Sequence, residues 1–253
     1  MGENMITDSF DIKTEPIFSP ESFYGEQKHI CDICIVLFSK VIYENVLNSF
    51  PCEEVAVLDA CNGDKPIYVF TYRDKKIAFY LSSIGATATA TEIIMTNWLT
   101  GATKFIMFGS AGSLNRRETE GRYVVPTAAY RDEGMSYHYA PPADYIDIPN
   151  AETVAGVFDT LKIPYVKGKV WTTDALYRET RGQMEQRVRE GCLAVDMELA
   201  GVQAVCSYHG FELYNFLMTG DVLDQPEYTY EGLYDANHSL DKFDLALEIA
   251  MRV

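Results

Sequence analysis

Short apolar runs alternate with longer segments of helical period along the chain from residue 31 onward. The runs predict β-strands at residues 33–38, 67–72, 76–81, 105–108, 123–126, 165–171 and 213–218. The helical segments predict α-helices at residues 40–48, 87–99, 151–161, 180–190, 198–209 and 239–251. This alternation is typical of the α/β class, so we expect a central mixed, twisted sheet flanked by helices.

The chain of 253 residues contains no linker rich in proline, glycine or serine. We therefore expect a single domain at residues 31–253, preceded by an N-terminal extension at residues 1–30. The extension is polar and acidic, unlike a secretory signal, and the aliphatic run at 33–38 is far shorter than the roughly 20 residues that cross a bilayer. These features favour a cytoplasmic protein.

The composition is strongly acidic, with 37 Asp and Glu against 21 Lys and Arg, a formal net charge of −16. Such a field repels nucleic acids and acidic membranes, so neither is an expected partner. An anionic substrate would need specific local donors to overcome the same repulsion. The six cysteines are scattered, and Cys31-x-x-Cys34 has no second Cys or His pair close by. We interpret both as small core residues and expect no metal.

Two carboxylates in the C-terminal third each follow an apolar, strand-like run. Glu198 comes after Ala194-Val195-Asp196-Met197, and Asp221 comes after Met218-Thr219-Gly220. Ligands of open α/β sheets lie beyond the carboxyl ends of the strands, so both groups can converge on one small polar molecule. Each also has a purely structural interpretation, as a helix cap for Glu198 and as a turn residue for Asp221.

Four other segments carry candidate chemistry. Gly109-Ser110-Ala111-Gly112 follows a predicted strand and is typical of a tight turn, which can also expose N–H groups to an anion. The mixed polar and aromatic loop at 131–142 is of a kind that borders binding sites, although its His138 alone identifies nothing. Trp171 is either a core residue or a flat face for a base. Residues 225–238 have no clear period and are interpreted as a loop over the pocket.

Taken in order, residues 109–112, 131–141, 171–177, 195–198 and 220–221 resemble the nucleoside phosphorylase and nucleosidase family. That family includes purine nucleoside phosphorylase, uridine phosphorylase and methylthioadenosine/S-adenosylhomocysteine nucleosidase. The resemblance covers about residues 31–251 and implies cleavage of the N-glycosidic bond of a nucleoside. It also implies that no metal or organic cofactor takes part and that the chain forms a homo-oligomer, a dimer or a hexamer.

The resemblance implies a role for each matched residue. Glu198 would accept hydrogen bonds from the ribose 2′- and 3′-hydroxyls, Met197 would pack on the sugar, and Asp221 would protonate the purine N7. Trp171 and Tyr177 would contact the base. The groups that would bind phosphate or another nucleophile are Gly85, Gly109 and Ser110.

Departures from the family pattern bear on the base and on the nucleophile. The 131–141 loop is most similar to that of uridine phosphorylases, but residues 177–182 lack the Gln-x-Arg pair that reads uracil. A purine base is therefore favoured, with a pyrimidine as the alternative. Met107 and residues 38–41 occupy the places of two phosphate-binding arginines. Candidate substitutes elsewhere in the sequence are Lys40, Arg73, Arg116 and Arg178.

Three functions remain open from the sequence, and the breadth of the family that the chain resembles favours the first. The first is phosphorolysis, with phosphate as co-substrate and a free base and pentose 1-phosphate as products. The second is hydrolysis by water, which the missing arginines favour. The third is noncatalytic binding of a nucleoside, against which the presence of both Glu198 and Asp221 argues.

Overall fold

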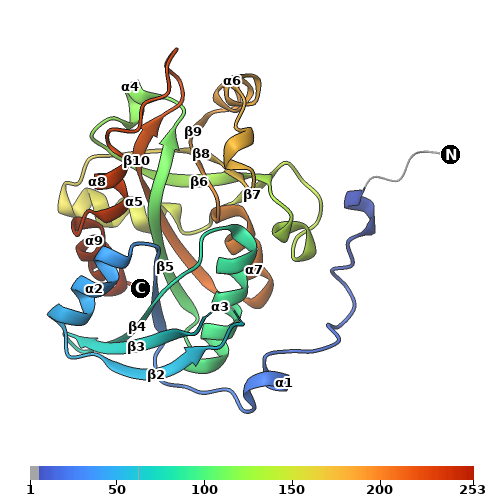
Figure 1. Ribbon diagram of the computed structural model, residues 1–253, viewed down its shortest axis with the longest axis vertical. Helices are drawn as coiled ribbons and strands as arrows, with labels where there is room; N and C mark the ends of the chain where they lie inside the picture. The colour runs from blue at the N-terminus through green and yellow to red at the C-terminus, as the bar shows by residue number, and fades with distance from the viewer. Residues whose placement is uncertain (1–5, 62) are drawn as a thin grey trace.

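The computed structural model describes residues 6–61 and 63–253, which form a 10-stranded mixed sheet with helices on both faces (Figure 1). The strands are β1 (Ile33–Leu37), β2 (Glu53–Leu58), β3 (Lys65–Tyr72), β4 (Lys75–Leu81), β5 (Lys104–Ser113), β6 (Tyr123–Asp132), β7 (Tyr145–Asp147), β8 (Tyr165–Thr173), β9 (Cys192–Asp196) and β10 (Glu212–Val222). The α-helices are α1 (Glu21–Tyr24), α2 (Lys40–Ser49), α3 (Ala86–Thr100), α4 (Arg116–Thr119), α5 (Ala151–Leu161), α6 (Arg181–Arg189), α7 (Leu199–His209), α8 (Leu233–His238) and α9 (Asp241–Ala250). Short 3-10 turns are η1 (Ile6–Ser9), η2 (Met135–His138) and η3 (Leu176–Arg178).

The central strand β5 lies between β1 and β10 and is parallel to both. Strand β10 also pairs with β6, while β9 pairs with both β8 and β5, so these strands close into a ring with β6 and β8 adjacent. The carboxyl ends of β1, β5 and β10 therefore point the same way. Groups that follow these strands are brought together at one edge of the sheet, as the sequence pattern predicted.

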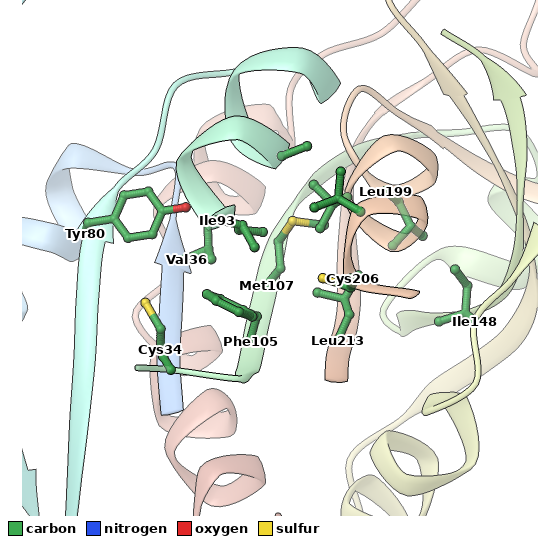
Figure 2. Packing of buried hydrophobic residues seen from close by; sticks show 14 of the residues in the cluster. Cys34, Val36, Tyr80, Ile93, Phe105, Met107, Ile148, Leu199, Cys206 and Leu213 are labelled. Atoms are coloured by element: carbon green, nitrogen blue, oxygen red, sulfur yellow. The ribbon is translucent and has the colours of Figure 1, made fainter. Parts of the chain in front are cut away.

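Helices α3 and α7 cover one face of the sheet, and α2, α5 and α9 cover the other. Figure 2 shows Val36 of β1 and Met107 of β5 on the same side as Ile93 of α3 and Leu199 of α7. Strand β1 is buried at every residue, which explains its unbroken apolar run. The predicted α/β class and the single domain with a mixed sheet are confirmed.

The element boundaries differ from the predictions in an informative way. Strands β5, β6 and β10 continue beyond the predicted runs, so residues 109–113 form the end of a strand rather than a turn. Strand β2 was not predicted, because its six residues begin with two exposed glutamates. The prediction of a loop at 225–238 is wrong for residues 233–238, which form α8. No helix among the described residues is long and apolar enough to span a membrane.

The N-terminal segment described from residue 6 contributes η1 and α1 but no strand of the sheet (Figure 1). Its contacts with the domain include a hydrogen bond from the Trp98 Nε1–H to the Gly25 carbonyl at 2.8 Å, and the ring of Phe10 lies 4.5 Å from that of His138. Cys31 and Cys34, which follow this segment, are both buried. They occupy the core positions expected of small apolar side chains.

Helix α8 approaches β10 at Gly220. A methyl group at Gly220 would lie 2.6 Å from Ala236 Cβ and 2.8 Å from Leu233 Cα, both in α8. We expect Gly220→Ala to displace α8 and to lower the free energy of unfolding by about 1–3 kcal/mol, as overpacking does. Urea denaturation measures this change.

The matched control is Gly156→Ala in α5, where an added Cβ meets no heavy atom within 4 Å. That variant should be as stable as the wild type or more stable, because alanine favours a helix interior. Equal unfolding midpoints for the two variants would contradict the close approach of α8 to β10.

Candidate active site

A cavity of about 490 Å³ opens at the carboxyl ends of β1, β5, β9 and β10. Its volume is within the range of small-molecule sites. Both predicted carboxylates, Glu198 and Asp221, line it. The other residues of the lining are Phe38, Ser39, Ile42, Ile84, Phe108, Gly109, Ser110, Ala111, Gly112, Leu176, Glu179, Val195, Asp196, Met197, Tyr228, Leu233, Asn237, His238 and Lys242.

Glu198 is held at the junction of β9 and α7, where it is the residue that precedes the first turn of the helix. Its carboxylate Oε1 accepts a hydrogen bond from the Gly85 backbone N–H at 2.7 Å. Gly85 has a φ of 106°, a conformation that side-chain-bearing residues rarely adopt. Burial, and secondly the Asp196 carboxylate, raise the pKa of Glu198 above its ordinary value. Donors from a bound ligand would favour its charged form.

Asp196 supports the loop that carries Glu198. Its carboxylate accepts hydrogen bonds from the Thr172 hydroxyl at 2.6 Å and from the Leu199 backbone N–H at 2.8 Å. It also accepts from the Glu198 backbone N–H at 3.2 Å. The sequence reasoning assigned Asp196 no role, although its place before Met197-Glu198 was visible. Asp196 therefore positions the start of α7, and with it the side chain of Glu198.

Asp221 lies on β10 just after a shift in the register between β10 and β5. The shift breaks the alternation of the strand and directs Asp221 into the cavity lining. The Tyr228 hydroxyl donates to Asp221 Oδ2 at 3.1 Å. Burial is the main cause that raises the pKa of Asp221. A carboxyl with a raised pKa retains a proton closer to neutral pH, which a general acid requires.

Glu179 is a third carboxyl in the lining, and the sequence reasoning did not single it out. It lies between η3 and α6. Burial and the nearby Asp221 carboxylate raise the pKa of Glu179 to about 7. The sequence shows Glu179 within residues 177–182, but it does not show that Glu179 and Asp221 lie in the same cavity.

A group of polar side chains completes the lining: Ser39, Ser110, Asn237, His238 and Lys242. The Ser39 hydroxyl lies 2.8 Å from His238 Nδ1, and the Ser110 hydroxyl donates to Asn237 Oδ1 at 2.6 Å. The Lys242 ammonium donates to the Ala236 and Asn237 carbonyls, and burial lowers its pKa to about 8. Only Ser110 of this group was a sequence candidate.

The aromatic candidates do not lie where they were predicted. Trp171 is 1% exposed, packs among Leu114, Met184, Cys192 and Val195, and does not itself line the cavity. Its indole N–H donates to Asp132 Oδ2 at 3.0 Å. Tyr177 is 96% exposed and also does not line the cavity. Neither Trp171 nor Tyr177 is therefore placed to contact a base in this cavity. Leu176, the residue before Tyr177, lines the cavity.

None of the four candidate substitute cations lines the cavity. Lys40 pairs with Glu44 on the surface of α2, Arg73 pairs with Glu248, and Arg116 pairs with Glu120. Arg178 is exposed on η3. The structure does not bring these residues to the cavity, where a substitute for the family's phosphate-binding arginines would be needed. The cation in the lining is Lys242, which comes from the C-terminal helix α9.

Met197, Gly109 and Ser110 line the cavity, as their predicted roles require. Gly85 lies beside it, but its N–H is occupied by Glu198 rather than available to an anion. Hydrogen bonds within the loop at 131–142 hold its two ends together: the Arg131 guanidinium donates to the Ser136 hydroxyl and to the Pro141 carbonyl. None of its residues lines the cavity.

The chain is similar in sequence and in fold to known proteins. The purine nucleoside phosphorylase DeoD-type of Bacillus subtilis (strain 168) is 24% identical over 233 residues, 88% of this chain and 95% of that protein. The solved 5′-methylthioadenosine/S-adenosyl homocysteine nucleosidase of Campylobacter jejuni is 17% identical, with a TM-score of 0.71 over 88% of this chain and 100% of the other. A futalosine hydrolase mutant of Helicobacter pylori strain 26695 gives the same identity, TM-score and coverage. The two structures show a shared fold.

The sequence model of the Phosphorylase superfamily matches residues 32–251. This match includes every strand of the sheet and all the residues that line the cavity. Because it covers most of the chain, the protein belongs to the phosphorylase superfamily and is an enzyme of that superfamily.

Proposed function

We propose that this enzyme cleaves the N-glycosidic bond of a purine nucleoside. The observation that carries the proposal is the shared cavity, in which Glu198 and Asp221 approach from different strands. Its apolar lining, including Phe38, Leu176 and Met197, suits the faces of a sugar and a heterocycle. A pyrimidine has no N7 for Asp221 to protonate, which favours the purine alternative.

On the sugar side, Glu198 would accept hydrogen bonds from the ribose hydroxyls. As the bond between C1′ and the base nitrogen breaks, the sugar carbon becomes cation-like, and a nearby carboxylate stabilises that charge. The Gly85 N–H and the turn supported by Asp196 hold Glu198 in place before the ligand arrives. Such preorganisation lowers the barrier without any movement during the reaction.

On the base side, the electron pair of the breaking bond leaves with the purine. Proton transfer from the Asp221 carboxyl to N7 neutralises the charge that would otherwise build up on the ring. The partial burial of Asp221 supports this assignment, because it raises the pKa of the carboxyl. After the base departs, a proton from solvent or from the attacking water restores the acid.

We propose water as the nucleophile that attacks C1′, which gives free pentose and free base. The support is the lining itself: among the described residues, no arginine contributes to the cavity. Arginine clamps phosphate through paired donors, and the net charge of −16 opposes an incoming dianion. A water molecule is uncharged, so it needs no paired arginine donors and is not repelled by the net negative charge.

Phosphorolysis is the second candidate, favoured by Lys242 and His238 in the lining. An ammonium has three donors, and the two carbonyl bonds of Lys242 leave one for an oxyanion. Together with the Ser39 hydroxyl, whose hydrogen is free when the His238 Nδ1–H donates to it, this donor would hold a phosphate near C1′. The products would then be the free base and pentose 1-phosphate.

Release of free base from adenosine, inosine, methylthioadenosine and uridine, with and without inorganic phosphate, tests the proposal. We expect purine release that does not depend on phosphate, because the lining lacks the paired donors of a phosphate clamp. Release only in the presence of phosphate would favour the second candidate, and Lys242→Met should then raise the KM for phosphate by about tenfold or more. No release from any nucleoside would contradict both.

A further inference from the structure

Glu179 faces the cavity, yet the mechanism above gives it no task. Its main chain is anchored on both sides. The Glu179 N–H donates to the Leu176 carbonyl at 3.4 Å, and the next residue, Thr180, forms a reciprocal cap with Gln183 at the start of α6. The Glu179 carboxyl therefore extends from a fixed backbone segment into a site whose other residues come mainly from distant parts of the chain.

The cavity lined by Glu179 also contains the titratable groups of Asp196, Glu198, Asp221, Tyr228, His238 and Lys242. Burial, and secondly the Asp221 carboxylate on β10, raise the pKa of Glu179. The charges of Glu179 and Tyr177 contribute to raising the pKa of Tyr228. Among the described residues, neither Glu179 nor Asp221 takes part in an ion pair. Two carboxyls without an ion-pair partner in one cavity do not both ionise readily, so near neutral pH the pair is expected to share about one proton. Before a ligand binds, the raised pKa of Glu179 favours that proton on Glu179.

We propose that Glu179 and Asp221 together read the substituent at C6 of the purine and select a 6-aminopurine over a 6-oxopurine. This inference rests on the proposed function, since it assumes that Asp221 faces N7. It assigns Glu179 to the adjacent C6 edge of the same base. The two carboxyls would then contact neighbouring atoms of the heterocycle, N7 and the C6 substituent.

The two kinds of purine make different demands on the pair. N7 accepts a hydrogen bond in both, whereas a 6-amino group donates and a 6-oxo group accepts. A 6-aminopurine thus requires one protonated carboxyl, at N7, and one carboxylate, at the amino group. A 6-oxopurine requires two protonated carboxyls. A pair that holds a single proton matches the first pattern.

The same count links recognition to catalysis. When Glu179 accepts from an amino group, its charge is stabilised, so the proton moves to Asp221, where cleavage needs it. When Glu179 must donate to a 6-oxo group, it retains the proton and leaves Asp221 ionised. The pair therefore disfavours 6-oxopurines both in binding and in turnover, and this penalty diminishes at acidic pH as a second proton is taken up.

Adenosine and inosine differ at C6 and test the inference directly. For the wild type at neutral pH, we expect kcat/KM for adenosine to exceed that for inosine by about tenfold or more, with a smaller ratio at mildly acidic pH. In Glu179→Gln the amide can donate or accept a hydrogen bond without taking up or losing a proton. The ratio of kcat/KM for adenosine to that for inosine should therefore shift toward inosine by about tenfold and lose its pH dependence. Glu185→Gln, an exposed position on α6, is the matched control and should keep the wild-type ratio.

Calorimetric titration with adenine and hypoxanthine reads the same preference without turnover. An absence of cleavage together with a preference for adenine that Glu179→Gln abolishes would reject the proposed function and retain the base-reading pair. Equal use of adenosine and inosine by the wild type would overturn the inference. So would an equal loss for both substrates in Glu179→Gln, because that result indicates a structural role only.

Discussion

Asp221→Asn should lower kcat for release of a purine by about 10²–10⁴-fold, the range that a general acid contributes. The amide keeps the shape of the side chain and can still accept from the Tyr228 hydroxyl, which lies 3.1 Å from Asp221 Oδ2. It cannot transfer a proton to N7. Binding of the nucleoside should change far less than kcat, because the acid matters most as the bond breaks. Steady-state kinetics and calorimetry on the same preparations measure the two effects.

The pH profile gives this variant a second readout. The protonated form of Asp221 decreases as pH rises through its raised pKa, so the wild-type rate should fall on the alkaline side of that value. Asp221→Asn should lose this limb of the profile. The control is Asp224→Asn, a nearby acid that accepts from the Arg116 backbone N–H and does not line the cavity. Equal losses in affinity and turnover for Asp221→Asn would count against its role as the acid.

Glu198→Ala should reduce kcat/KM by roughly 10²–10³-fold or more, comparable to the loss of a preorganised group that faces developing charge. Truncation removes both the acceptor for the ribose hydroxyls and the negative charge near C1′. Stability should not fall to the same extent, because Asp196 still accepts from the Leu199 N–H at the start of α7. Activity assays paired with thermal unfolding separate these effects.

Deoxynucleosides sharpen the test of Glu198. A 2′-deoxyribose lacks one of the hydroxyls that Glu198 is proposed to hold, so the wild type should use it less well than ribose. In Glu198→Ala the difference between the two sugars should nearly vanish, as expected when one interaction is removed from either side. If Glu198→Ala discriminated as strongly as the wild type, the ribose contact would have to lie elsewhere.

The sequence pattern predicted the central strands well because burial on both faces leaves a continuous apolar signature. Strand β1 is the clearest case, since all five of its residues are buried. Strand β2 lacks that signature, because Glu53 and Glu54 are exposed. Helix α8 was missed since its six residues include no more than one buried residue, Ala236, and a helix this short is defined by its packing on Gly220.

The two acidic residues could be found from sequence because each stands directly after a strand-like run, a local signal. The polar group around Lys242 could not, since its members come from distant segments: Ser39 and His238 are 199 positions apart. Trp171 shows the limit of a residue type as a guide. Its large aromatic ring suits either a base or the core, and only the direction of the side chain from β8, toward Met184 and Cys192, decides for the core.

A crystal structure with a C-nucleoside analogue of adenosine, whose carbon–carbon bond to the sugar resists cleavage, tests the central claim most directly. We expect the analogue in the cavity at the ends of β5, β9 and β10, with ribose hydroxyls within hydrogen-bond distance of the Glu198 carboxylate and N7 within reach of Asp221. An analogue bound with its sugar away from Glu198, or with Glu198 and Asp221 contacting the same part of the ligand, would contradict the account.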